Sequence, residues 1–160
     1  MKTVRQRSKR SLLIFKMMYH LCRLVLGSVL IYASIDKIVD PAAFGKIIFS
    51  YQLLPDQMIN ITAIVLPWLE LVVGILLVFQ LWMPGTIMLI NTLFMVFTGA
   101  ILSALLRGLD INCGCFSTSG GEGSINMITF FRDFSFIVMA FFLLIFTFFP
   151  QKIGMPFQKD

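Results

Sequence analysis

Charged side chains are scarce in this chain, since Asp, Glu, Lys and Arg make up only 13% of its 160 residues. That is about half the share found in soluble domains, which need charge over a surface that faces water. Hydrophobic residues make up 58% of the chain, and the mean hydropathy is +0.90. The shortage of charge therefore excludes an ordinary soluble domain and predicts a protein whose main solvent is lipid.

Metal-binding side chains are equally few, because the chain has a single histidine, His20, and three cysteines. A structural zinc site takes about four ligands, so no metal site is expected, and a haem held by two histidines is excluded. We expect His20 to be a polar residue near the membrane surface. The sequence shows no internal repeat of solenoid length, which predicts one compact domain.

Four long apolar runs are what the sequence has in place of charge. They cover residues 17–35, 59–81, 85–106 and 128–149, each near the ~20 residues that cross a bilayer as a helix. Backbone groups in lipid must be satisfied within their own segment, so each run should be helical. The expected fold class is all-α, a four-helix transmembrane bundle. Residues 17–149 would form the membrane domain, with tails at 1–16 and 150–160.

The connector between the first two runs predicts a short additional helix. Asp40 is suited to cap a helix that starts at Pro41. Apolar residues then recur at helical spacing on one face: Phe44, Ile47, Ile48 and Tyr51. This stripe predicts a helix that lies flat at the membrane interface between spans one and two.

Basic residues are unevenly distributed, which predicts the orientation of the chain. Most of them lie in the two tails: Lys2, Arg5, Arg7, Lys9, Arg10, Lys16, Lys152 and Lys159. The two long connectors hold only Lys37, Lys46 and Arg107. Both termini are therefore expected in the cytoplasm, with both long connectors outside. No soluble basic face is predicted, so we expect the lipid bilayer as a partner and no nucleic acid.

Two of the cysteines lie together in the connector before the last span, as Cys113-Gly114-Cys115. Thiols on the oxidising side of a membrane tend to pair, and Gly114 allows the sharp turn that this spacing needs. A strained bond is easily reduced, which favours redox exchange by the pair. A passive local disulfide and two thiols that pair with another protein are the alternatives. Cys22, in the first span, is expected to be an apolar packing residue.

Two charged residues near the middle of their spans, Arg23 and Glu70, are candidates for an ion pair. Charge in lipid is costly, so each should face the bundle and find a partner. They lie at comparable depth on antiparallel spans. They would form either a quinone or proton site, or a structural pair that sets the helix register.

Arg132 and Asp133 open the last span near the outer surface. Arg132 is a candidate for stabilising a thiolate at Cys113 or Cys115. Asp133 either neutralises Arg132 or pairs with another cation, because neighbouring residues point apart on a helix. The other cations considered are Lys37 and Arg107.

The order of the short motifs resembles one known family. From the N-terminus they are Arg23 with Gly27, Asp36-Lys37-Ile38-Val39-Asp40-Pro41 with Phe44, Tyr51-Gln52-Leu53-Leu54-Pro55, Leu66-Pro67-Trp68-Leu69-Glu70-Leu71 with Gly74, Arg107-Gly108, Cys113-Gly114-Cys115-Phe116 and Arg132-Asp133. Over residues 17–149 the chain resembles the methylamine-utilisation membrane protein family (MauE), within the wider DoxX-like group. The resemblance implies a four-helix protein of the bacterial inner (plasma) membrane. One departure is Ser117, since a Gly often follows the Cys-Gly-Cys-Phe stretch in relatives.

The resemblance also implies a function that concerns thiols and electrons. Family members are linked to maturation of methylamine dehydrogenase, whose small subunit holds many disulfides, and often occur with a thioredoxin-like partner. This implies that Cys113 and Cys115 move reducing equivalents in thiol–disulfide exchange with a thioredoxin-like or other redox protein, as an oxidoreductase component. Related DoxX-type proteins are associated with quinone, the one cofactor implied. The alternatives are a non-catalytic anchor or assembly subunit of a redox complex, and a small transporter.

Overall fold

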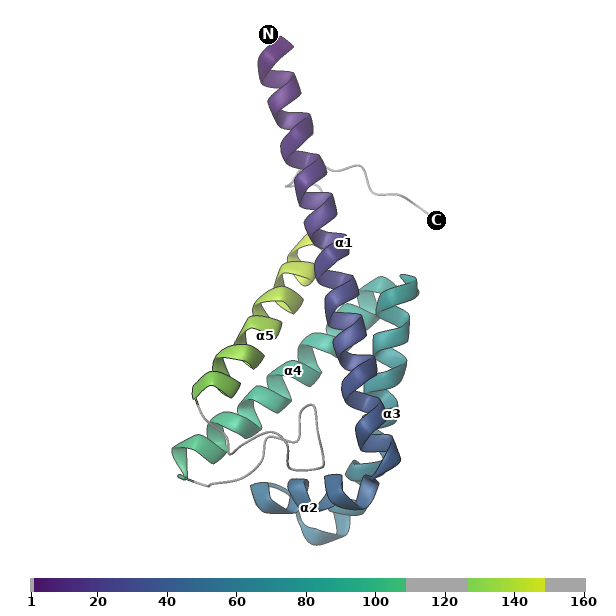
Figure 1. The fold of residues 1–160 in the computed structure, drawn as a ribbon, viewed down its shortest axis with the longest axis vertical. Helices are drawn as coiled ribbons and strands as arrows, with labels where there is room; N and C mark the ends of the chain where they lie inside the picture. The colour runs from purple at the N-terminus through teal and green to yellow at the C-terminus, as the bar shows by residue number, and fades with distance from the viewer. Residues whose placement is uncertain (1, 109–126, 149–160) are drawn as a thin grey trace.

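The computed structural model describes residues 2–108 and 127–148, and every element in these ranges is an α-helix (Figure 1). The helices are α1 (Lys2–Val39), α2 (Pro41–Tyr51), α3 (Asp56–Phe79), α4 (Met83–Leu106) and α5 (Met127–Phe148). Four of their segments are long and apolar enough to cross a membrane: Leu13–Val39, Asp56–Phe79, Met83–Leu106 and Phe131–Phe148. The predicted all-α bundle with four spans and a short helix between the first two is confirmed.

Helix α1 is longer than its predicted span and continues through both flanking segments. It includes residues 2–16, which belong to the predicted N-terminal tail, and runs on to Val39, in the predicted connector. Its buried residues Leu26, Leu30, Ala33 and Lys37 recur at i, i+4, i+7 and i+11, which is one face of a single helix. Lys37, which was counted as a connector cation, is therefore a buried residue of α1.

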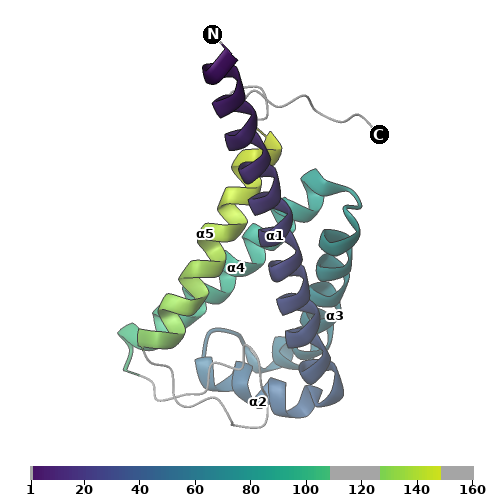
Figure 2. The ribbon, with the colours of Figure 1, turned by 45° about the horizontal axis from the view of Figure 1, so that its top comes forward.

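Helix α2 begins and ends at the capping signals that its sequence carries. Asp40 Oδ1 accepts a hydrogen bond from the Ala43 N–H at 2.9 Å, and Pro41 occupies the first turn. The helix ends where Gln52 adopts a left-handed conformation. Phe44 is buried, and α2 packs mainly on α3. Figure 2 shows α2 lying across one end of the bundle, transverse to the long helices.

Helices α1 and α3 pack closely because glycine faces glycine across their interface. A Cβ on Gly27 would lie 3.2 Å from the Gly74 carbonyl oxygen and 2.6 Å from Val78 Cγ2. A Cβ on Gly74 would lie 3.1 Å from the Gly27 carbonyl oxygen. Small residues let helices in lipid approach to backbone contact. This contact sets which residues of α1 lie opposite which residues of α3.

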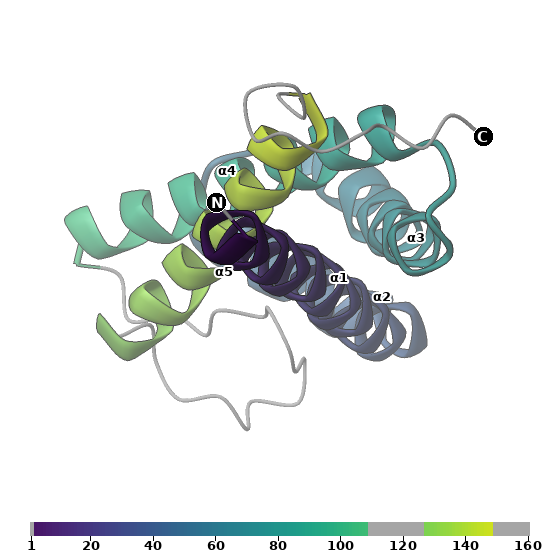
Figure 3. The same cartoon turned by 90° about the horizontal axis from the view of Figure 1, so that it is seen from above.

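Helices α4 and α5 form the second half of the bundle. The Asn91 side-chain amide of α4 donates to the Ala140 carbonyl of α5 at 3.1 Å, and Tyr19 of α1 hydrogen-bonds Thr147 of α5. Seen from above in Figure 3, α1 and α3 run side by side and α4 crosses the bundle beside α5. The α4–α5 pair diverges from the α1–α3 pair toward the end that carries α2 (Figures 1 and 2). The charged residues of the candidate site lie between these two pairs of helices, toward the end of the bundle that carries α2.

Candidate functional site

A buried ion pair joins the C-terminal end of α1 to the middle of α3. Lys37 Nζ lies 2.9 Å from both carboxylate oxygens of Glu70. The two residues are only 2% and 1% exposed. Glu70 follows Pro67, which also lies inside α3 and is buried. A charge held away from water needs both a counter-ion and additional hydrogen bonds or polar contacts, and here each residue supplies the other's counter-ion.

Aromatic rings complete the surroundings of the Lys37 ammonium. It lies 5.1 Å from the ring centroid of Phe44 on α2 and 5.0 Å from that of Phe97 on α4. The faces of aromatic rings carry negative charge and attract cations at these distances. Lys37 therefore contacts residues of α2, α3 and α4, and its side chain connects these helices at one point.

A small cavity borders this ion pair. It measures about 40 Å³ and lies between α1, α3, α4 and α5. Its polar lining consists of Lys37, Glu70, Thr98 and Asp133, and its aromatic lining of Phe94, Phe97 and Phe136. Within the described part of the chain, the buried Thr98 hydroxyl has no hydrogen-bond partner. Apolar side chains make up most of the cavity wall, and the few polar groups are set among them. Two carboxylates from different helices, Glu70 of α3 and Asp133 of α5, thus line the same cavity.

The polar face of α5 begins beside this cavity. Arg132 Nε lies 3.2 Å from Asp133 Oδ1, so Asp133 neutralises its neighbour, which was one of the two expectations for it. Asp133 is 6% exposed and also lines the cavity that Lys37 borders. The Arg132 side chain is one-third exposed. Cys113 and Cys115, which Arg132 was expected to serve, lie outside the described residues.

The expected pairing of Arg23 with Glu70 is wrong, because Glu70 binds Lys37 instead. About 21 Å of helix rise separates Arg23 from Lys37 along α1, so one carboxylate cannot serve both cations. Arg23 is itself buried, near the other end of the bundle. The sequence suggested Lys37 only as a partner for Asp133, so its pairing with Glu70 was missed. The helical recurrence of Leu26, Leu30 and Ala33 leads directly to Lys37 and was the signal available.

Arg107 ties α4 to α2 at the same end of the bundle. Its guanidinium donates to the Tyr51 carbonyl at 3.1 Å and to Gln52 Oε1 at 3.0 Å. These bonds lie where α4 ends, just before segment 109–126, which contains Cys113 and Cys115. Arg107 therefore ties the C-terminal end of α4 to the C-terminal end of α2.

The remaining candidates are ordinary packing and surface residues. Cys22 is partly buried against the hydrophobic core, as expected for an apolar packing residue, and His20 is exposed. Among the described residues, no group of three or more His, Cys, Asp or Glu side chains is placed to hold a metal ion. The cavity beside Lys37 is thus the site in which polar groups converge.

Comparisons with known proteins point to one family. A family model described as methylamine utilisation protein MauE matches residues 15–146. The methylamine utilization protein MauE of Paracoccus denitrificans is 31% identical over 96 residues, which cover 59% of this chain and 51% of the relative. The chain therefore spans about half the length of this curated relative. No solved structure matches.

Proposed function

The chain belongs to the MauE family of methylamine utilisation proteins, and from this premise we propose that it moves reducing equivalents for thiol–disulfide exchange at the outer face of a bacterial inner membrane. Its termini would be cytoplasmic and the Cys113–Cys115 segment external. The family's name suggests that this exchange serves methylamine utilisation. The partner of the chain would be a redox protein. The chain would act as the membrane component of an oxidoreductase system.

The observation that carries this proposal is the position of the cavity beside Lys37 relative to the residues that flank the cysteine segment. Segment 109–126 follows α4, which is tied to α2 by Arg107, and leads into α5, whose Asp133 lines the cavity. The Lys37–Glu70 pair borders the same cavity. The cysteine segment is thus joined at both ends to the half of the bundle that holds two buried carboxylates. Reoxidation of a reduced cysteine pair releases two protons along with two electrons, and these carboxylates would relay the protons to the electron acceptor.

The proposed exchange transfers two electrons in two displacement steps. A partner thiolate attacks the Cys113–Cys115 disulfide, forms a mixed disulfide with one cysteine and releases the other as a thiolate. The second partner thiolate then displaces the bound cysteine. The partner leaves as a disulfide, and Cys113 and Cys115 are left as a reduced pair. Arg132, at the start of α5, would stabilise the cysteine thiolate that is released.

Regeneration of the disulfide needs an acceptor for two electrons and two protons. A membrane quinone, which becomes a quinol, or the disulfide of a second thiol protein supplies this capacity. Ligand pockets usually measure about 300–1,000 Å³, so the cavity of about 40 Å³ beside Glu70 is too small for a quinone ring. We therefore assign Glu70 and Asp133 to proton transfer and not to quinone binding.

A specific observation also supports a second candidate function, that of a membrane anchor or assembly subunit. Phe49, Leu53 and Leu54 are exposed around the end of α2, at the end of the bundle to which the cysteine segment is joined. Exposed apolar groups that cluster in this way are common at protein contacts. In this case a redox partner would dock on α2, and the cysteines would not take part in chemistry.

Thiol trapping in intact cells tests the exchange function. The full chain is treated with a membrane-impermeant maleimide before and after reduction, and the mass shift is measured. We expect Cys113 and Cys115 to react only after reduction, and a C113S/C115S variant to leave the partner reduced. The C22S variant is the matched control and should behave as wild type. Normal oxidation of the partner in C113S/C115S cells would contradict exchange and support the anchor function.

A further inference from the structure

Arg23 carries buried donors that the described residues leave without a hydrogen-bond partner. The residue is 8% exposed, and within the described parts of the chain its Nε and Nη1 have no hydrogen-bond partner. A guanidinium is always charged, so this arrangement is costly unless an anion completes it. The carboxylate once expected to do so, Glu70, is held by Lys37. The unpaired donors therefore indicate a missing anionic ligand.

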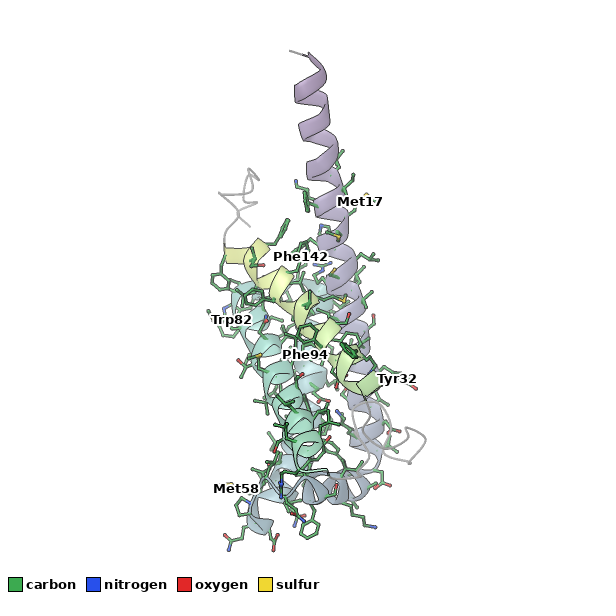
Figure 4. The ribbon with its side chains drawn as sticks, turned by 90° about the vertical axis from the view of Figure 1, so that its left-hand side faces the viewer. Met17, Tyr32, Met58, Trp82, Phe94 and Phe142 are labelled. Atoms are coloured by element: carbon green, nitrogen blue, oxygen red, sulfur yellow. The ribbon has the colours of Figure 1, made fainter. Side chains whose placement is uncertain are left out.

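The depth of Arg23 in the bundle identifies the environment of that ligand. Gly27 lies opposite Gly74 and Val78, so Arg23, one turn earlier on α1, lies level with the end of α3. The link from α3 to α4 follows there and exposes Trp82, which is 74% accessible. Figure 4 shows Trp82 and Met17 toward one end of the bundle and Met58 at the other. Tryptophan is enriched where acyl chains meet head groups, so Arg23 lies near that boundary.

Two further basic residues share the face of α1 that carries Arg23. Lys16, His20 and Arg23 are spaced at i, i+4 and i+7, and both Lys16 and His20 are exposed. His20 lies close enough to Lys16 and Arg23 for their charges to act on it. The side chains of a helix point toward its N-terminus, which brings the Arg23 guanidinium toward Tyr19 and His20. The three residues thus form a basic stripe that leads from the surface to the buried guanidinium.

The described carboxylates all lie away from this stripe. Asp36 and Asp40 are at the opposite end of α1, Asp56 starts α3, and Glu70 and Asp133 border the cavity. Apolar residues of α1 beside the stripe, Leu21 and Leu24, are 63% and 44% exposed. A ligand that contacts both the basic stripe and these exposed leucines needs an anionic head group and an apolar chain.

We propose that Arg23, with Lys16 and His20, binds the phosphodiester head group of an anionic phospholipid in the leaflet on the N-terminal side. The phosphate oxygens accept hydrogen bonds from the Arg23 guanidinium, which turns toward His20 to present its donors. A guanidinium is suited to this task because its planar fork matches two phosphate oxygens. The acyl chains lie along Leu21 and Leu24. The site is separate from the cavity beside Lys37.

Lipid binding to the full chain in detergent tests this proposal. Native mass spectrometry and thermal unfolding would be measured with phosphatidylglycerol, with phosphatidylcholine and with inorganic phosphate alone. We expect phosphatidylglycerol to bind and to raise the Tm, while the other two probes have little effect. Loss of one charge-assisted contact should weaken phosphatidylglycerol binding about tenfold in R23Q, and R23K should be intermediate because it keeps the charge without the fork.

Two matched variants keep the result interpretable. K46Q removes a basic residue from the exposed surface of α2, at the other end of the bundle, and should bind lipid as wild type does. K16Q removes an exposed cation from the stripe, leaves the packing intact and should weaken binding about fivefold. Equal lipid binding in wild type, K16Q and R23Q would overturn the proposal. Protection by inorganic phosphate equal to that by phosphatidylglycerol would also overturn it, since the ligand would then be a free anion.

Discussion

At the scale of single residues, Lys37 is the most informative side chain of the molecule. Its ammonium contacts both oxygens of Glu70 and the rings of Phe44 and Phe97, and the residue also lines the cavity between the helices. Removing one member of a buried ion pair leaves the other charge without compensation, whereas replacing both with apolar residues is often tolerated. The pair can therefore be tested for structure and for chemistry separately.

We predict that Lys37→Met and Glu70→Met each destabilise the protein by about 3–5 kcal/mol, because each leaves an unpaired buried charge. The double variant should recover most of this loss, since no charge remains buried. Thermal unfolding of the full chain in detergent, analysed as a double-mutant cycle, measures the coupling. Lys46→Met, which replaces an exposed cation on α2, is the control.

Measuring oxidation of the partner distinguishes a role of the Lys37–Glu70 pair in proton transfer from a role in helix packing. If Glu70 accepts protons during thiol exchange, the double variant should fold but fail to oxidise its partner. A stable and fully active double variant would show that the pair serves only the packing of the helices. Single variants as stable as wild type would contradict the ion pair itself.

At the scale of elements, the contact between α1 and α3 depends on two glycines. A Cβ added to Gly27 would lie 3.2 Å from the Gly74 carbonyl oxygen, and a Cβ added to Gly74 would lie 3.1 Å from the Gly27 carbonyl oxygen. Both distances are crowded. Gly99 of α4 differs, because a Cβ added there would meet nothing within 4 Å. The three glycines therefore separate the effect of helix packing from that of helix propensity.

We predict that Gly27→Ala and Gly74→Ala each cost about 1–3 kcal/mol, because the added methyl group forces the helices apart. Gly99→Ala should be neutral or stabilise by up to about 1 kcal/mol, since alanine is the better helix former. Thermal unfolding and hydrogen exchange in α3 provide the measurements. Equal effects at all three positions would exclude a close α1–α3 contact.

At the scale of the whole molecule, the charge distribution predicts how the bundle is inserted. The N-terminal tail is strongly basic, and the end with α2 carries few exposed cations. The structure adds that Lys37 is buried in α1 and paired with Glu70. The exposed connectors are thus even poorer in positive charge than the sequence count implied, which strengthens the expected orientation.

We predict that green fluorescent protein fused to the C-terminus fluoresces in a bacterial host, because it folds in the cytoplasm. Alkaline phosphatase fused after residue 108 should be active, because it would be exported. Alkaline phosphatase at the C-terminus, expected to be inactive, is the control. The reverse pattern of activities would invert the topology and place Cys113 and Cys115 in the reducing cytoplasm, which would remove the basis of the exchange function.

The sequence by itself determined the elements of this protein. Three of the four apolar runs and the Asp40–Pro41 helix start predict helix bounds to within a few residues, because lipid requires each span to satisfy its own backbone, whereas α1 extends well beyond its apolar run. The burial of Glu70 and Asp133 follows from the same reasoning, since charges within spans avoid lipid. Helical periodicity also indicates which face of α1 is buried.

Only the tertiary structure decided which charges meet. Periodicity places a residue on a face of its helix, but its partner depends on how far one helix is shifted along the other. The contact of Gly27 with Gly74 sets that shift. It brings Glu70 beside Lys37 and leaves Arg23 level with the end of α3, without a protein partner for Nε and Nη1 among the described residues. Such a contact depends on the shapes of both helices together, and neither apolar run specifies it alone.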